Sequence, residues 1–384
     1  MAMTTRELQS LTPLRGIAAV WVICFHFVVV YFAFRPEQFS WVFNKGYLAV
    51  DMFFMLSGFV LSHVYWRAFA VDASAQAGKY WSFMGARVAR LYPLHLFNLC
   101  QFVVATLAFR FWQDGYAGKL SSIPVEGPRS LTALAANVAM LQGIKASELA
   151  WNYPAWSISV EFFAYFLFPL GLPMMARADA RTRSLLAAAA VSALGLFAYL
   201  AGGDFNQWDG PITLLRCLPE FVLGALSYAG FRASLWPDWF SRDGTVAAVA
   251  AGLLVLLHFG APDILVVAAF PAVILTAVMN AGRVAPVLNA GPLVWLGEIS
   301  YSLYLAHGFV QFLTTKLLAG AGVRDPAELP YASAAWMLLA MLGATLLMAA
   351  FTHRRIEIAG RTRLRRILAA PGDRSSPQPA SRLA

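Results

Sequence analysis

Residues 17–34 read IAAVWVICFHFVVVYFAF, and this uncharged run decides the fold class. A stretch of this length and composition crosses a bilayer as a helix. His26 lies near its middle, where an ionisable ring is costly and usually serves a function. Arg15 stands eleven positions earlier. At about 100° per residue, an α-helix brings Arg15 and His26 to within about 20° of one face, roughly 16 Å apart along the axis.

The whole chain of 384 residues has the composition of a polytopic membrane protein. Hydrophobic residues make up 59% and charged residues only 13%, whereas soluble domains carry about 25% charged residues. The net charge of +9 is concentrated after residue 352, where eight arginines face two acids, as is typical of cytoplasmic flanks. No aromatic and basic binding module accompanies it, so we expect no nucleic-acid partner. The three cysteines lack the spacing of a metal site, and we expect no metal.

Ten apolar stretches are long enough for membrane helices. Basic residues follow each even-numbered stretch, which predicts that these loops and both termini lie in the cytoplasm. We therefore expect an all-α, polytopic helix bundle of about ten transmembrane helices in the inner (cytoplasmic) membrane, formed by residues 1–368. Residues 369–384 are expected to be a disordered tail, and residues 131–144 a short interfacial or re-entrant helix on the outer side. The ten predicted spans are residues 15–34, 46–66, 91–111, 154–176, 184–201, 211–230, 244–260, 262–281, 292–318 and 331–352.

Carboxylates occur at membrane depth in two of these spans. Asp51 lies in the outer half of the second, where it could cap the helix, pair with a cation or line an active site. Ser157 and Glu161 are four residues apart and share one face of the fourth. They could simply form a helix start, but the apolar residues that follow place Glu161 about one turn into the span.

Two further groups suggest a site that crosses the membrane. Ser300, Tyr304 and His307 share one face of the ninth span by their spacing, although hydroxyls can also serve only to hold helices together. Arg87 and Arg90 precede the third span and share a helix face. They could be an ordinary positive-inside signal, or a guanidinium pair that grips a phosphorylated cofactor together with Arg15.

Five motifs, in order from the first predicted span to the ninth, resemble the acyltransferase 3 family of membrane proteins, which O-acylate sugars and other cell-surface molecules. Each motif alone is weak, but together they cover essentially the whole chain. Ala86 departs from the family pattern, since relatives often carry an arginine there. The motifs are LRGIAA (14–19) with His26, DMFFMLSGF (51–59), RVARLYP (87–93), WSISVE (156–161) and GEISYSLYLAH (297–307).

The resemblance implies a transferase that moves an acyl group, foremost acetyl, from acyl-CoA to a hydroxyl of a carbohydrate or glycolipid. Such transfer needs a base and stabilisation of an oxyanion. We expect His26 to be the base, with Glu161 or Asp51 orienting its ring; an acyl-histidine intermediate is a second route. The expected donor-binding residues are Arg15, Arg87, Arg90 and Tyr92, and the expected acceptor-binding residues are Ser157, Ser300, Tyr304 and His307.

Two other classes of protein fit the same polar residues. A transporter or flippase of an anionic or sugar-lipid substrate would also place histidines and acids inside the membrane, although we find no inverted repeat of the kind common in transporters. A membrane scaffold would tolerate replacement of His26. The sequence leaves the acceptor, the acyl chain and any homo-oligomer open.

Overall fold

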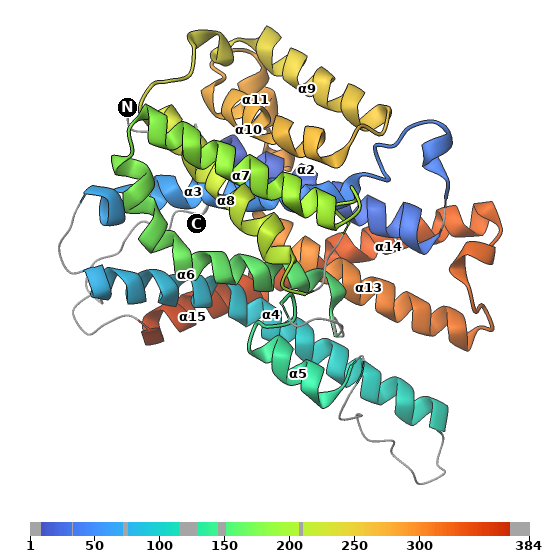
Figure 1. The fold of residues 1–384 in the computed structure, drawn as a ribbon. Coiled ribbons are helices and arrows are strands. Elements are labelled where there is room, and N and C mark those ends of the chain that lie inside the picture. The colour runs from blue at the N-terminus through green and yellow to red at the C-terminus, as the bar shows by residue number, and fades with distance from the viewer. Residues whose placement is uncertain are drawn as a thin grey trace.

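The computed structural model describes residues 9–32, 34–71, 76–114, 127, 129–144, 151–206 and 210–368. Over these ranges the chain is helical and contains no strand, which confirms the all-α class. The long helices run across Figure 1 in roughly one direction and pack side by side. The predicted tail over 369–384 lies outside the described residues.

The helices follow one another in the order shown by the colours of Figure 1. They are α2 (Leu11–Cys24), α3 (Ala49–Trp66), α4 (Gln76–Asp114), α5 (Leu131–Val138), α6 (Trp156–Arg177), α7 (Ala180–Leu200), α8 (Thr213–Arg232), α9 (Asp243–His258), α10 (Asp263–Met279), α11 (Val284–Leu288), α12 (Gly291–Glu298), α13 (Ser300–Gly320), α14 (Tyr331–Thr352) and α15 (Ile358–Leu368). Three π-helical segments, η1 (Phe25–Tyr31), η4 (Arg67–Val71) and η8 (His353–Glu357), extend α2, α3 and α14. Short 3₁₀ turns are η2 (Pro36–Gln38), η3 (Gly46–Leu48), η5 (Tyr153–Ala155), η6 (Asp238–Ser241) and η7 (Pro326–Glu328).

Within the described ranges, seven helical segments are long and apolar enough to cross a membrane, so the chain is a multi-pass membrane protein. These segments contain α2, α3, α4, α6, α7, α8 and α14. The apolar helices α9 and α10 are shorter, with 16 and 17 residues. All ten predicted spans therefore fall on helices, while the number that cross the bilayer and the cytoplasmic placement of the termini stay predictions.

Three predicted boundaries are wrong. The third helix begins at Gln76 instead of residue 91, because the basic segment continues the helix and packs against α15. Arg87 and Arg90 therefore lie within α4 and do not precede it. The ninth predicted span is divided at Ile299 into α12 and α13. The tenth continues through η8 into α15 instead of ending at residue 352.

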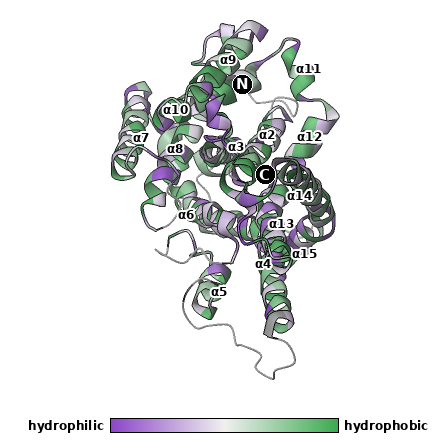
Figure 2. Cartoon of the chain, turned by 90° about the vertical axis from the view of Figure 1, so that its right-hand side faces the viewer, coloured by the Kyte–Doolittle hydropathy of each residue, from purple (hydrophilic) through white to green (hydrophobic). Residues whose placement is uncertain are grey.

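Large apolar side chains are exposed on the peripheral helices α7 and α14, and the ribbon of α14 is mostly in the hydrophobic colour in Figure 2. Leu185 and Leu200 of α7, and Trp336 and Leu347 of α14, are among the exposed ones. In water, contiguous exposed apolar surface of this kind would favour aggregation. It is the surface expected of helices that face lipid.

Helices α3 and α8 approach each other backbone to backbone. A Cβ atom added to Gly58 of α3 would collide with the carbonyl oxygen of Phe221, and one added to Gly224 of α8 would collide with that of Met55. Small residues at such positions let two membrane helices approach backbone to backbone. This contact fixes α3, which carries both Asp51 and Ser57.

The apolar stretch predicted over 131–144 forms only the short helix α5, whose first turn is capped by the side chain of Ser130. His95 of α4 contacts the carbonyl oxygen of Asn137 through its Nε2 atom, at 2.8 Å. Helix α5 thus lies against α4 at the edge of the bundle (Figure 1). Eight residues are too few to span a bilayer, which agrees with the prediction that this segment is not an eleventh span.

The contact between α3 and α8 predicts that Gly58→Ala lowers the free energy of unfolding by about 1–3 kcal/mol, the usual range for overpacking. Gly343→Ala is the matched control, because a Cβ atom there meets nothing within 4 Å and alanine favours the helix. Thermal unfolding of both variants in the same detergent measures the difference. Equal melting temperatures would contradict the inferred backbone contact.

Candidate active site

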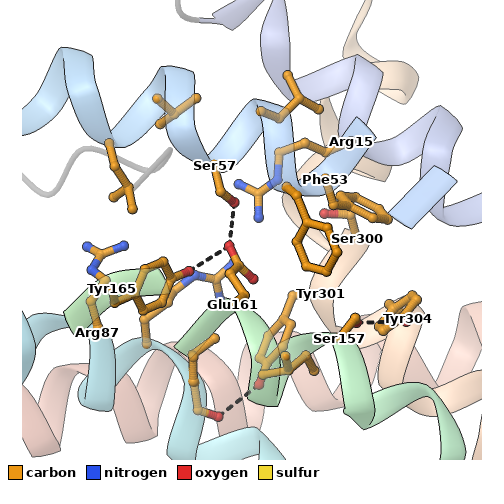
Figure 3. A pocket seen from close by; sticks show the side chains of 17 residues that line it. Arg15, Phe53, Ser57, Arg87, Ser157, Glu161, Tyr165, Ser300, Tyr301 and Tyr304 are labelled. Carbon is orange, nitrogen blue, oxygen red and sulfur yellow. Dashed lines mark hydrogen bonds between the residues drawn. The ribbon is translucent and has the colours of Figure 1, made fainter. Parts of the chain in front are cut away.

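A cavity of about 90 Å³ lies where α2, α3, α4, α6 and α13 meet. Polar side chains from all five helices point toward it in Figure 3. Helices far apart in the chain therefore supply one polar chamber inside an apolar bundle. The predicted site residues that line it are Arg15, Arg87, Arg90, Ser157, Glu161, Ser300 and Tyr304.

Arg15 reaches the cavity from α2 (Figure 3). Helix α2 approaches α12 closely here, since a Cβ atom on Gly16 would lie 2.7 Å from the backbone nitrogen of Gly297. The Arg15 guanidinium forms no hydrogen bond or ion pair with any residue in the described ranges, although Glu161 and Glu357 are electrostatic neighbours. Arg15 is therefore a cation whose hydrogen-bond donors remain available inside the cavity.

The carboxylate of Glu161 accepts two hydrogen bonds across the cavity, as the dashed lines of Figure 3 show. One comes from the Ser57 hydroxyl of α3, and the other from Tyr165 one turn later on α6, at 2.7 Å. Ser157 and Tyr304 share a hydrogen bond at 2.9 Å and so join α6 to α13. The predicted face of Ser157 and Glu161 is thus turned toward the cavity.

Arg87 is surrounded by aromatic rings. Its guanidinium carbon lies 5.6 Å from the ring centroids of Tyr65 and Phe83 and 5.8 Å from that of Tyr165. It donates a hydrogen bond of 3.2 Å to the Tyr65 hydroxyl, and its buried Nε atom has no partner in the described part of the chain. Aromatic faces stabilise a guanidinium without neutralising it, so Arg87 retains its full charge for a ligand.

Arg90, in contrast, is neutralised by a carboxylate that the sequence did not suggest as a site residue. It forms an ion pair with Glu357 of η8. Glu357 also accepts a hydrogen bond of 2.7 Å from Ser302 and lies 3.1 Å from Nδ1 of His353. Glu357 thus ties the end of α14 to α4 and α13. An acid placed among many arginines was the sequence signal that could have revealed it.

His26 lies beside the cavity and not on its wall. It is the second residue of η1, a π-helical segment, and π-helical turns often occur at functional sites. Its ring stacks on that of His307, with centroids 5.2 Å apart, and lies 4.8 Å from the Tyr153 ring. His307 in turn lies 5.6 Å from the ring of Tyr304, which lines the cavity. One aromatic residue therefore separates the histidine pair from the cavity.

His307 is fully buried. The polar groups beside its ring are the backbone carbonyl groups of Leu303 and Tyr304, about one turn earlier on α13. The structure thus stacks His26 on a second buried imidazole.

The polar face of α13 is longer than its sequence spacing led us to expect. Beyond His307 it continues with Gln311, which accepts a hydrogen bond of 2.7 Å from Tyr153, and with Thr315, which donates one of 3.2 Å to Tyr31. Their spacing of four residues repeats that of Ser300 and Tyr304. A polar stripe therefore runs along α13 from the cavity past His26.

Asp51 has a partner other than His26. Its two carboxylate oxygens accept bonds of 2.7 and 2.6 Å from Nε and a terminal nitrogen of Arg216 on α8. Arg216 also donates to the carbonyl oxygen of Phe205 at 2.5 Å, and its guanidinium carbon lies 5.3 Å from the centroid of the Trp156 ring. Both partners of the ion pair are fully buried. The sequence signal for this pair is an arginine inside an apolar span, but its partner was not predicted.

Glu220, one turn after Arg216 on α8, is another buried acid that was not predicted as part of the site. Its carboxyl group is fully buried beside Asp51 and Arg216. Its hydrogen-bonding neighbour is the side chain of Asp51. The centre of the bundle therefore holds two carboxyl groups beside the Arg216 guanidinium.

The last predicted site residue, Tyr92, does not line the cavity. Its ring lies 5.9 Å from that of Phe162 and 6.5 Å from that of His95, with edge-to-face geometry. Tyr92 thus contributes to the packing of α4 against α6. Across the described ranges, no group of three or more His, Cys, Asp or Glu residues is placed to hold a metal ion.

Comparison with known proteins identifies the family. The family model described as an acyltransferase domain, acyltransferase 3, matches residues 8–353. The chain belongs to the acyltransferase 3 family. It is accordingly an acyltransferase, and its apolar helices make it a multi-pass membrane enzyme.

Curated relatives carry names of the same kind. The chain is 27% identical to acyltransferase MdmB of Streptomyces mycarofaciens over 390 residues, covering 91% of both chains. It is 23% identical to O-acetyltransferase OatA of Staphylococcus aureus over 338 residues, covering 79% of this chain and 50% of the relative. The chain thus matches about half the length of OatA. No solved structure matches the chain.

The pair of Asp51 and Arg216 yields a stability prediction. Asp51→Asn removes the carboxylate that accepts two hydrogen bonds from the buried Arg216 guanidinium, which should lower the free energy of unfolding by about 3–5 kcal/mol. Replacing both partners, as Asp51→Leu with Arg216→Met, should recover much of that loss because the guanidinium is removed together with the carboxylate that pairs with it. Thermal unfolding in detergent compares the three proteins. A double variant that is no more stable than Asp51→Asn would contradict the pairing.

Proposed function

We propose that this enzyme transfers an acyl group, foremost acetyl, from cytosolic acyl-CoA to a hydroxyl group of a cell-surface carbohydrate or glycolipid. The family and the named O-acetyltransferase relative support acyl transfer to oxygen. The observation that carries the donor assignment is the unpartnered Arg15 guanidinium in the described part of the cavity, with Arg87 also lining it. Guanidinium groups suit phosphate recognition because they donate several hydrogen bonds in a fixed geometry.

The position of His26 suits a base for the acceptor hydroxyl. Helix α2 is regular from Leu11 to Cys24, so most of the chain between Arg15 and His26 follows α-helical geometry, which spans roughly 16 Å over eleven residues. A pantetheine arm has a length of that order. Phosphates held at Arg15 would thus place the thioester near the histidine pair.

The proposed reaction uses the His26 ring and the hydroxyl groups of Tyr304 and Ser157. The acceptor oxygen attacks the thioester carbonyl carbon while His26 takes the hydroxyl proton. The carbon–sulfur bond then breaks, and the proton passes to the departing thiolate. The hydroxyl groups of Tyr304 and Ser157, which already bond to each other, are the nearest candidate donors to the developing oxyanion.

The two predicted carboxylates take different parts in this proposal. Glu161 lies in the cavity near Arg15 and orders Ser57 and Tyr165 around it. Asp51 has an indirect, structural part, because its ion pair with Arg216 fixes α3 against α8. The residue in contact with the His26 ring that could stabilise its protonated form is Tyr153, and His307 could share the proton.

The acceptor would approach along the outer part of the polar stripe on α13. Gln311 and Thr315, with their partners Tyr153 and Tyr31, offer hydroxyl and amide groups beyond His26. Such groups suit a polyhydroxylated acceptor. The basic loops support an orientation with the Arg15 end and both termini in the cytoplasm, which suits an enzyme of the cytoplasmic membrane.

A transporter that moves its substrate unchanged is the rival interpretation of the same buried histidines. The two functions differ in one product, a new ester. We therefore expect purified enzyme in liposomes to transfer label from radiolabelled acetyl-CoA to protein or added glycan, and His26→Ala to abolish that transfer. The variant should keep the elution volume and melting temperature of the wild type. Full transfer by a folded His26→Ala variant would overturn the base assignment.

The donor assignment predicts a different kinetic effect at the arginines. Arg87→Ala should raise the apparent KM for acyl-CoA at least about tenfold, the effect of losing one charge-assisted hydrogen bond, with a smaller change in kcat. Arg177→Ala, at the end of α6 and outside the cavity, is the control for lost positive charge. A fall in kcat at constant KM would contradict a role in holding the donor.

A further inference from the structure

The C-terminal helix α15 lies beyond the residues that define the family. The family match ends at residue 353, whereas α15 comprises Ile358–Leu368. The helix nevertheless packs along α4, where a Cβ atom on Gly360 would collide with the Pro93 ring. This contact places α15 against the same part of α4 that carries Arg87 and Arg90.

One face of α15 adds positive charge beside Arg87 and Arg90. Arg361 has Arg90, Arg365 and Arg87 as electrostatic neighbours, and Glu357 is also near it. Arg365 has the Tyr65 hydroxyl, Arg87 and Arg90 as electrostatic neighbours. Four guanidinium groups from α4 and α15 thus lie close to one another, and Glu357 forms its ion pair with one of them, Arg90.

This convergence is electrostatically unfavourable on its own. Like charges in a partly buried setting repel one another strongly because water screens them poorly. Glu357 already pairs with Arg90. The Nε atom of Arg365 is buried without a hydrogen-bond partner in the described ranges. A multiply charged anion between α4 and α15 would relieve the repulsion and satisfy the Arg365 donor.

The opposite face of α15 provides an internal comparison. Arg363 and Arg366 belong to the same helix and are both exposed, whereas Arg361 and Arg365 are partly buried. They are suited to contact with solvent or with lipid headgroups. The helix therefore carries two pairs of arginines of equal charge that differ in the direction they face.

We propose that Arg361 and Arg365 form, with Arg87 and Arg90, a phosphate-binding clamp that holds the bisphosphorylated nucleotide end of the donor. The inference rests on the proposed function, since it assumes that the donor is acyl-CoA. It extends the donor site beyond the residues that define the family. The ligand chemistry is that of clustered phosphates, which a free nucleotide and an anionic lipid headgroup share.

The test compares two double variants of the full-length enzyme in detergent. Arg361→Gln with Arg365→Gln removes the inner pair, and Arg363→Gln with Arg366→Gln removes the outer pair. The probes are coenzyme A and adenosine 3′,5′-bisphosphate, titrated by calorimetry. We expect the inner double variant to bind both at least about tenfold more weakly and the outer one to bind within about twofold of wild type. Arg365→Gln alone should show a smaller loss, and it keeps the test open if the inner double variant does not fold.

Each other outcome overturns the inference in a distinguishable way. Equal affinities of folded inner and outer variants would refute the clamp and leave the proposed function untouched. Failure of the wild type to bind either probe would refute the acyl-CoA donor itself. Measurements in nanodiscs test the alternative that the ligand is an anionic lipid headgroup. If phosphatidylglycerol stabilises the wild type but not the inner variant, while nucleotide affinity stays equal in both, the cluster is a lipid site and the clamp is refuted.

Discussion

The ion pair between Asp51 and Arg216 is the interaction on which the arrangement of this bundle depends. Charges inside an apolar bundle must be paired, and this pair joins α3 to α8 about two turns from the glycines that let the two backbones approach. Helix α3 also supplies Ser57 to the cavity. The same pair also fixes the segment between α7 and α8, because Arg216 donates a hydrogen bond to the carbonyl oxygen of Phe205.

Compared with the rest of the described bundle, the cavity contains arginines that have no carboxylate partner. Arg90 is neutralised by Glu357, and Lys45 by Asp263 at 2.5 Å. Arg15 and Arg87, by contrast, form no ion pair within the described residues. A cation buried inside a membrane protein is energetically costly unless it is paired. A negatively charged ligand bound beside these two arginines would supply the ion-pair partner that they lack.

Much of this could be predicted from local sequence, and the rest could not for identifiable reasons. Helix positions follow from apolar length, and the shared face of Ser157 and Glu161 follows from spacing. The partners of Asp51 and Arg90 stand 165 and 267 positions away in the chain, and no periodicity reveals them. The early start of α4 also escaped prediction, because a run of basic residues resembles a loop until its counter-charge is known. The catalytic roles themselves remain proposals.

The π-helical segment η1 has a consequence for how the first span can vary in length. A π-helix closes hydrogen bonds five residues apart, so its turns are wider than those of α2. A deletion within α2 would rotate Arg15 away from His26 by about 100°. A deletion among Val28, Val29 and Val30 would instead draw η1 toward α-helical register and leave Arg15 and His26 in place. The first span can therefore lose a residue after His26 without changing how Arg15 and His26 lie relative to each other.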